Sequence, residues 1–248
     1  MSVQSLRSLP PAKERLARPS PDFADKLSRT ADLLRRIARD FSPAVQASSL
    51  GAEDVVLSHL VAELELPIPL FVLQTGALHT ETLALLERTQ AQAPQGVEVF
   101  TPEHSAVLHF VRTQGQDAMY RSLALRKDCC ALRKLEPLAR ALHGRQAWLT
   151  GLRREQSGAR AVVPLEEVDT AHPGLTKFNP LAEWTWGDIW HYIAIHGVDY
   201  NPLHDQFYPS IGCAPCTRAI TDGEDFRAGR WWWEDETAKE CGLHVKTP

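Results

Sequence analysis

The chain has 248 residues, 44% of them hydrophobic and 23% charged, with a formal net charge of −4 at pH 7. This length and apolar content suit one large α/β domain or two small ones, and the slight negative charge excludes nucleic-acid binding through a global basic field. The sequence has no apolar signal core at its start and no apolar run that could span a bilayer. We therefore expect a cytoplasmic protein that binds neither nucleic acid nor membrane.

Predicted strands and helices alternate along the chain. Residues 1–20 are rich in Pro, Ser and Arg and are expected to be a flexible N-terminal segment. From there on, apolar residues recur either at helical spacing or in short runs bounded by turn residues. Strands are expected at 43–50, 69–74, 97–100 and 147–151, and helices at 22–41, 52–64, 80–92, 104–114, 131–142 and from Thr185 onwards.

This alternation predicts the fold class and the position of a ligand. Strands that alternate with helices form a parallel sheet with helices on both faces. Such sheets bind ligands beyond the carboxyl ends of their strands. We expect an α/β domain over 21–230, with its site built from the turns after the strands, and a mobile C-terminal tail over 231–248.

The five cysteines fall into two pairs and a single residue. Cys129 and Cys130 are adjacent, Cys213 and Cys216 form a C-x-x-C, and Cys241 stands alone near the end. A cytosolic location and an odd count argue against a disulfide framework, and buried inert cysteines are a second alternative. Two tight pairs of thiols favour a metal site. Adjacent cysteines suit an iron–sulfur cluster better than a tetrahedral zinc ion, although the sequence leaves both open.

Basic residues are concentrated near these features and suggest a small anionic ligand. The segment GLRREQSGAR supplies Arg153, Arg154 and Arg160, and a guanidinium matches a tetrahedral oxyanion with two parallel hydrogen bonds. Lys134 lies four residues after Cys130, so on a helix the two share a face. It could therefore separate a negative cluster from an anionic substrate. For each arginine the alternative is a solvated surface charge.

The first strand leads into a helix through SSLGAED. Gly51 is expected to let the backbone turn tightly and approach a ligand, and the amides at a helix start favour phosphate or sulfate. The segment matches neither a P-loop nor G-x-G-x-x-G, and such turns often bind nothing.

The C-terminal segment ECGLH combines Cys241 with Gly242 and His244. A cysteine that reacts needs thiolate character and access, which a mobile segment near cations provides. The alternative is an exposed cysteine without a role. The run GRWWWED before it could anchor the tail or be ordinary packing.

Together these motifs resemble a known family. They are SLGAED, TGALHTET, CC-x-x-RK-x-x-PL, TG-x-RR-x-QS-x-x-R, N-P-L-x-x-W, C-x-P-C and E-C-G-L-H. From about Val45 to His244 the chain is similar to the assimilatory adenylyl-sulfate reductases. These belong to the phosphosulfate reductase family within the adenine-nucleotide α-hydrolase-like fold.

The resemblance implies reduction of adenosine 5′-phosphosulfate to sulfite and AMP in sulfate assimilation. The Cys241 thiolate would form a thiosulfonate, and thioredoxin or a similar dithiol would release sulfite. It also implies a 4Fe-4S cluster, and a homo-oligomer is left open. The residues implied are Cys129, Cys130, Cys213 and Cys216 for the cluster, Lys134 between cluster and substrate, Arg160, Arg227 and Arg230 for the phosphosulfate, Ser48, Ser49, Gly51 and Asp54 for the nucleotide loop, and His244 near the closing tail.

Three other functions remain open from the sequence. The first is the same reaction on 3′-phosphoadenylyl sulfate. The second is an ATP-using tRNA thiolase, which would need an SGG-x-DS loop and a basic RNA surface. The third is a zinc-bound nucleotide sensor, which would leave Cys241 without a purpose.

Overall fold

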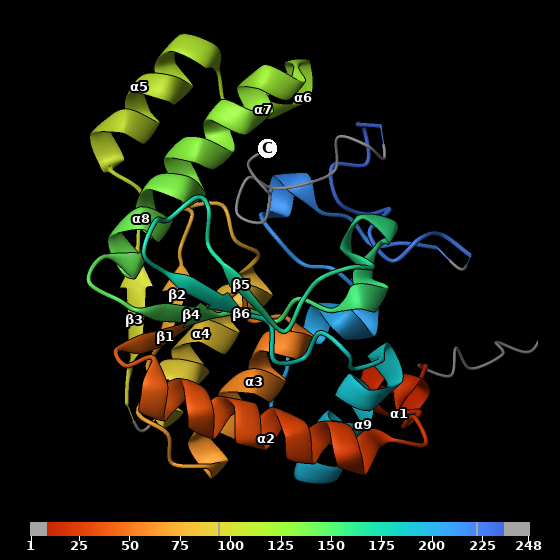
Figure 1. Cartoon of the computed structure of the whole chain (residues 1–248). Coiled ribbons are helices and arrows are strands. Elements are labelled where there is room, and N and C mark those ends of the chain that lie inside the picture. Colours follow the sequence, from red (N-terminus) through yellow and green to blue (C-terminus); the bar gives the residue numbers. More distant parts are fainter. Residues whose placement is uncertain (1–8, 94, 222, 236–248) are drawn as a thin grey trace, which may run out of the picture.

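A computed structural model describes residues 9–93, 95–221 and 223–235 of the chain (Figure 1). Its centre is a six-stranded sheet in the order β3-β2-β1-β4-β6-β5. Neighbouring strands run parallel except β5, which is antiparallel to β6 at the edge. The strands are β1 (Ala44–Ser48), β2 (Leu70–Leu73), β3 (Val97–Phe100), β4 (Ala147–Leu149), β5 (Glu166–Val168) and β6 (Thr176–Phe178).

The predicted parallel sheet is confirmed, and so are its first four strands. The sequence missed β5 and β6, each of which has three residues. Two of the three residues of β5 are exposed, so no apolar run marks it.

Helices flank the sheet, and most of them lie where the sequence predicts. The helix expected at 131–142 is the second half of a longer helical run that begins at Leu123 and contains a π-helical turn over 131–135. The helices are α1 (Ala12–Leu16), α2 (Phe23–Asp40), α3 (Ala52–Glu63), α4 (Thr80–Gln92), α5 (His104–Gln114), α6 (Ala118–Arg121), α7 (Leu123–Cys130), α8 (Glu136–Leu142) and α9 (Trp186–His196). Short 3-10 turns occupy Arg154–Gln156, Gly158–Arg160, Pro202–Gln206 and Ala214–Cys216.

The sheet is covered on both faces because its strand residues alternate between two cores. In β4, Ala147 and Leu149 join the cluster formed with α2, α3 and α9, whereas Trp148 joins the opposite cluster with Leu138 and Leu142 of α8. Successive strand side chains point to opposite faces, so both kinds of position are buried here. This is the burial pattern expected of a parallel sheet.

The N-terminal segment differs from its expected flexibility within the described residues 9–20. Helix α1 packs against α9, and the Ala12 amide donates to Asp205 Oδ1 at 2.6 Å. The Arg18 amide donates to the Gly187 carbonyl. A Cβ on Gly187 would lie 2.1 Å from the Arg18 carbonyl oxygen, so the glycine permits the close approach. Tertiary contacts order a segment whose composition is typical of a loop.

The strand order places a crevice between β1 and β4. From β1 the chain builds outwards through β2 to β3, and it then returns to the other side of β1 to add β4. The carboxyl ends of β1 and β4 therefore lie at the switch point of the strand order, where doubly wound sheets bind ligands. Within the described part of the chain, no helix is long and apolar enough to cross a membrane.

Candidate active site

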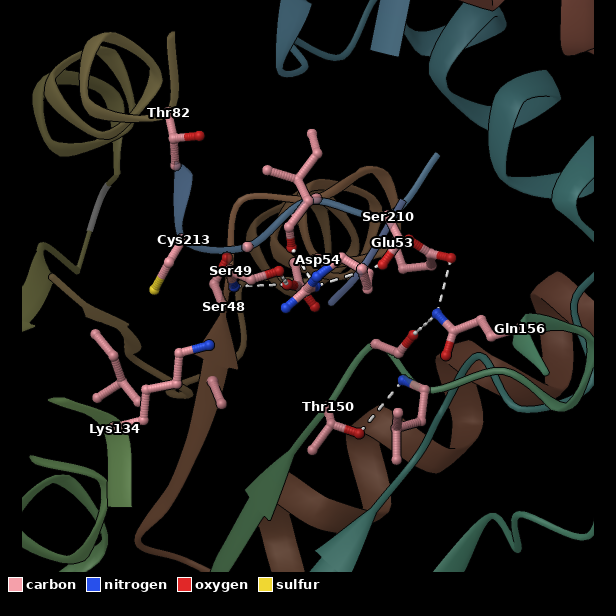
Figure 2. A pocket seen from close by; sticks show the side chains of 18 of the residues that line it. Ser48, Ser49, Glu53, Asp54, Thr82, Lys134, Thr150, Gln156, Ser210 and Cys213 are labelled. Atoms are coloured by element: carbon pink, nitrogen blue, oxygen red, sulfur yellow. Dashed lines mark hydrogen bonds between the residues drawn. The ribbon is translucent and has the colours of Figure 1, made fainter. Parts of the chain in front are cut away.

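A cavity of about 200 Å³ opens at the carboxyl ends of β1, β2 and β4 (Figure 2). Its walls come from the loops after these strands and from the segments around 204–213 and 226–231. Every predicted substrate-binding residue within the described chain lines it: Ser48, Ser49, Gly51, Asp54, Lys134, Arg160, Arg227 and Arg230. Cys241 and His244 lie outside the described residues.

The loop after β1 is held by its own side chains. Ser49 donates to Asp54 Oδ2 from its amide at 2.6 Å and from its hydroxyl at 2.7 Å, and the Leu50 amide donates to Ser48 Oγ. The tight turn expected at Gly51 falls instead at Leu50, whose φ is +59°, whereas Gly51 is extended with φ of −76°. A Cβ on Gly51 would make only ordinary contacts within the protein. The turn therefore does not require the glycine.

A buried histidine caps the helix that follows. The Ala52 amide at the start of α3 donates to His204 Nε2 at 3.1 Å, and His204 Nδ1 lies 2.7 Å from the Tyr208 carbonyl oxygen. Burial lowers the pKa of His204 to about 4. The ring is therefore neutral near pH 7, donating from Nδ1 and accepting at Nε2. Sequence reasoning missed His204, because nothing local marks it as the partner of a helix start.

The loop after β4 approaches α3 so closely that only glycine fits. A Cβ on Gly151 would lie 2.5 Å from Asp54 Oδ1 and 2.8 Å from the Glu53 Cβ. Burial raises the pKa of Asp54 to about 6, against the hydrogen bonds from Ser49 that lower it. The two loops at the switch point therefore form one packed wall of the cavity.

Four cationic side chains face this cavity. Lys134, Arg160, Arg227 and Arg230 line the cavity, and the three arginines are buried. Arg230 donates from Nη1 to the Ile211 carbonyl at 3.1 Å, and its guanidinium packs where a Cβ on Gly212 would stand. Buried guanidinium groups in a concave site suit a phosphate or sulfate.

Of the three arginines in GLRREQSGAR, only Arg160 lines the cavity. Arg153 is fully buried and pairs with Glu53 at 2.9 Å. Arg154 is exposed and pairs with Glu183. The three arginines therefore differ in place: Arg153 neutralises a carboxylate, Arg154 faces solvent, and Arg160, the one predicted to bind the substrate, lines the cavity.

A second cavity of about 270 Å³ adjoins the first and is lined by all four described cysteines, Cys129, Cys130, Cys213 and Cys216. Three residues line both cavities: Lys134, Cys213 and Trp231. Three guanidinium groups lie near the Trp231 ring: Arg126, which lines the second cavity, at 4.7 Å, and Arg230 and Arg227, which line the first, at 4.6 Å and 5.9 Å. The wall between the cavities is therefore aromatic and cationic.

The buried thiols form a donor set without disulfides among the described cysteines. Burial raises the pKa of Cys129 and raises that of Cys216 to about 11, so ligation of a metal would have to displace protons. Thr75 Oγ1 lies 3.2 Å from Cys213 Sγ. Within residues 9–235 as described, no three His, Cys, Asp or Glu side chains converge closely enough to hold one metal ion. The four cysteines that line this cavity supply a donor set suited to a metal site, and adjacent cysteines suit a group with several metal atoms better than one tetrahedral ion.

The helix that carries the adjacent cysteines changes its winding directly after them. Residues 131–135 form a π-helical turn between α7 and α8, and π turns often mark functional sites. Lys134 lies within this turn, and its charge acts on both Cys129 and Cys216. Arg133 donates to the Thr75 carbonyl at 2.6 Å and so ties the turn to the loop after β2.

The first residues of the predicted tail belong to this wall. The Trp231 amide donates to the Cys216 carbonyl, and Trp231 is 1% exposed. Glu234 accepts two hydrogen bonds from the buried guanidinium of Arg126. The Trp run therefore anchors residues 231–235 beside the cysteine cavity.

The sheet order, the crevice at its switch point and the anion-binding walls define a nucleotide-binding protein of the doubly wound α/β class. The profile of the phosphoadenosine phosphosulfate reductase domain matches residues 43–219. The chain therefore belongs to the phosphoadenosine phosphosulfate reductase family.

Relatives within this family align over most of their length. The adenosine 5′-phosphosulfate reductase of Allochromatium vinosum is 53% identical over 213 residues, which cover 86% of this chain and 83% of the relative. That of Burkholderia cepacia is 49% identical, covering 92% and 91%. The solved phosphoadenylyl-sulfate reductase of Candida auris, a phosphate complex, aligns with a TM-score of 0.65 at 24% identity, over 79% of this chain and 97% of that one. At that identity the likeness shows the fold alone.

Proposed function

We propose that the chain reduces adenosine 5′-phosphosulfate to sulfite and AMP, as part of sulfate assimilation. One observation carries this proposal. In this chain, residues from separate loops line a cavity that suits an anion. That cavity shares a wall with a second cavity, which four cysteines line. A tRNA thiolase or a nucleotide sensor accounts for neither the family match nor this pairing of cavities.

The unphosphorylated nucleotide is favoured over 3′-phosphoadenylyl sulfate. The relatives that share about half of their residues with this chain are named adenosine 5′-phosphosulfate reductases. The likeness to a phosphoadenylyl-sulfate reductase rests on 24% identity and concerns the fold.

In the proposed reaction Cys241 is the nucleophile and its thiolate attacks the sulfonyl sulfur. A sulfur–sulfur bond forms while the bond from sulfur to the phosphate oxygen breaks, and AMP leaves. One thiolate of a dithiol then attacks the Cys241 sulfur, sulfite departs with the electron pair, and a mixed disulfide with Cys241 remains. The second thiol attacks this mixed disulfide, which frees the Cys241 thiolate and leaves the dithiol as a disulfide. Two thiols supply the two electrons, and the path is divided by a covalent intermediate.

The described residues hold the substrate for this step. Arg160, Arg227 and Arg230 bind the phosphosulfate, and their charge stabilises the phosphate oxygen that becomes the leaving group. Ser48, Ser49, Gly51 and Asp54 form the loop that cradles the nucleotide. Lys134 lies between the anion and the thiol cavity and offsets the negative charge on both sides.

A 4Fe-4S cluster fits the second cavity, held by Cys129, Cys130, Cys213 and Cys216. When bound, such a group supplies a local negative charge and ties the end of α7 to the segment around 213–216. Because the reacting thiols already provide two electrons, its proposed role is structural and electrostatic.

The proposal requires Cys241 to reach the first cavity from residue 235. Glu234 is fixed to Arg126 at the edge of the thiol cavity, and Cys241 follows Asp235 by six residues. An extended chain of that length spans at most about 21 Å. His244, three residues further on, would accompany the nucleophile. We place the reaction in the cytoplasm, where thioredoxin-type dithiols keep thiols reduced.

Mass spectrometry tests the proposal. Enzyme mixed with adenosine 5′-phosphosulfate and no reductant is expected to gain one sulfonate on the peptide that carries Cys241. The Cys241→Ser variant is expected to bind nucleotide and iron but to form no adduct and no sulfite. Sulfite at the wild-type rate from this variant would show that Cys241 is not the nucleophile.

A further inference from the structure

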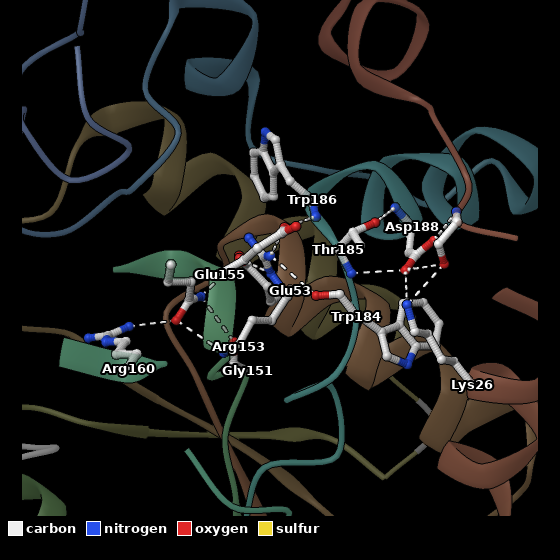
Figure 3. A network of polar contacts seen from close by, with 12 residues as sticks. Lys26, Glu53, Gly151, Arg153, Glu155, Arg160, Trp184, Thr185, Trp186 and Asp188 are labelled. Carbon is white, nitrogen blue, oxygen red and sulfur yellow. Dashed lines mark hydrogen bonds and ion pairs between the residues drawn. The ribbon is translucent and has the colours of Figure 1, made fainter. Parts of the chain in front are cut away.

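We propose that Gln156 is the positioning residue for Arg160, and that Glu53 fixes the orientation in which it does so. The proposal rests on the proposed function, in which Arg160 binds the anionic end of the substrate. Gln156 and Glu53 both line the nucleotide cavity, and neither is cationic (Figures 2 and 3). A hydrogen bond joins the two side chains, and a second one joins Gln156 to Arg160.

All four hydrogen-bonding positions of the Gln156 amide are used. Its Nε2 donates to Glu53 Oε1 at 2.9 Å and to the Gly151 carbonyl at 3.2 Å. Its Oε1 accepts from the Arg153 amide at 3.2 Å and from Arg160 Nη1 at 2.6 Å. The side chain is 7% exposed, so water competes little with these bonds. A buried amide with every position filled has one favoured orientation.

Glu53 decides which end of the amide faces the arginine. A carboxylate only accepts hydrogen bonds, so the nitrogen of Gln156 must face Glu53 and the oxygen must face Arg160. Arg153, fully buried, donates from Nε to the same Glu53 oxygen at 2.9 Å and holds that side chain in place. The chain of contacts Arg153–Glu53–Gln156–Arg160 thus links the first turn of α3 to the anion-binding wall.

The arrangement also explains why a carboxylate, that of Glu53, lies beside a site for an anion. Glu53 faces the cavity that binds the negative substrate, yet Arg153 neutralises it. Its remaining effect on the site passes through Gln156. We infer that the carboxylate serves to set the direction of Arg160 rather than to contact the substrate.

Binding of ADP and of adenosine to the full chain measures this role. ADP is an anionic nucleotide that cannot be reduced to sulfite, and adenosine lacks the anion. Gln156→Leu keeps the approximate volume but removes the hydrogen bonds. We expect this variant to weaken ADP binding by at least about tenfold, because one charge-assisted hydrogen bond is lost. Adenosine binding should weaken by less than about twofold. Equal losses for both ligands would mean that Gln156 only supports the fold, and would overturn the proposal.

A double-mutant cycle with Arg160→Ala separates positioning from indirect effects. In the Arg160→Ala background, Gln156→Leu is expected to change ADP affinity by less than about twofold, because the group that it orients is gone. Additive losses would also overturn the proposal.

An exchange of the two side chains gives a rescue. Gln156→Glu alone sets a second carboxylate 2.9 Å from Glu53 and should weaken ADP binding further. The pair Glu53→Gln with Gln156→Glu restores a donor facing an acceptor between the two residues and still accepts from Arg160, but it loses the bond to the Gly151 carbonyl, so it should recover part of the loss. Failure of the exchange to improve on Gln156→Glu would contradict the orienting role of Glu53.

Arg154→Gln is the matched control, since it changes an exposed neighbour in the same loop that pairs only with groups away from the cavity. ADP affinity close to wild type is expected. Because ADP binding does not depend on turnover, absence of sulfite formation would refute the proposed function while leaving the test of Gln156 intact.

Discussion

The anion-binding wall depends on single residues that leave room for a guanidinium. Gly212 is an example, because an added Cβ would lie 2.3 Å from Arg230 Nη2 and 2.5 Å from its Cζ. The atoms that would clash are the far end of a flexible side chain. The backbone can therefore stay in place while Arg230 moves.

We expect Gly212→Ala to raise the KM for adenosine 5′-phosphosulfate by about tenfold, the usual effect of losing one charge-assisted contact. The melting temperature should change little. Steady-state sulfite formation with thermal unfolding on the same samples measures both. Gly158→Ala is the control, because nothing lies within 4 Å of its added Cβ. Wild-type KM in Gly212→Ala would mean that Arg230 does not hold the substrate.

Residue-level reasoning from the sequence found charged groups more readily than buried hydrogen-bond partners. Arg160, Arg230 and Lys134 stand out because their chemistry suits an anion wherever they lie. His204 and Glu53 do not, because their roles depend on contacts across the fold, with Ala52 for one and with Arg153 and Gln156 for the other. Such pairings cannot be inferred from spacing along the chain.

Among the elements, α9 begins at a capping box that also anchors the N-terminal segment (Figure 3). Asp188 accepts from the Thr185 amide at 2.8 Å, from the Ser20 amide at 2.7 Å and from Lys26 Nζ at 3.2 Å. The box itself was predictable from Thr185 and Asp188. The contacts with Ser20 and Lys26 were not, because they join segments more than 160 residues apart.

We expect Asp188→Asn to lower the free energy of unfolding by about 3 kcal/mol, because it leaves the buried Lys26 ammonium with only the exposed Asp22 as a charged partner. Urea unfolding at pH 7 measures the loss. Asp32→Asn, which affects only an exposed pair with Arg35, should change stability by less than about 0.5 kcal/mol. An unchanged midpoint in Asp188→Asn would show that this network adds nothing to stability.

The hydrogen bonds around Asp188 also predict how the free energy of unfolding depends on pH. Burial alone would raise the pKa of Asp188, but hydrogen bonds from Ser20 and Thr185 outweigh it and hold the pKa below its ordinary value of 3.8. A carboxyl with a lowered pKa stabilises the fold above its ordinary pKa, and loses that contribution as the pH falls through the folded value. The difference between wild type and Asp188→Asn should therefore stay constant above about pH 5 and shrink below pH 4.

At the scale of the whole molecule, the periodic pattern predicted the parallel sheet, and the sheet order determines where the site lies. The sequence did not predict helix α1 or the edge strand β5, because tertiary contacts rather than a local pattern stabilise them. The grouping of the cysteines into two tight pairs indicated a shared site, and all four line one cavity although the pairs lie more than 80 residues apart in the chain. Of the wall that the two cavities share, the place of Lys134 was predicted, whereas that of Trp231 was not.

That shared wall couples the thiol cavity to the nucleotide cavity. The segment around 213–217 forms a bridge from Cys213 to Leu78 and another from Thr217 to Arg230. Loss of the proposed cluster would release one side of both bridges. We therefore expect Cys216→Ser to lose iron, lower the melting temperature and weaken ADP binding by about tenfold or more, although Cys216 does not line the nucleotide cavity.

Lys134→Gln distinguishes this coupling from simple loss of charge, because Lys134 lines both cavities without being a thiol ligand. It should keep its iron and its melting temperature yet bind ADP several-fold more weakly, the effect of one removed cation in a partly buried site. Iron analysis, thermal unfolding and ADP titration on the two variants provide the comparison. If Cys216→Ser lost its iron and still bound ADP as the wild type does, the two cavities would be independent, and the thiol site would serve only local stability.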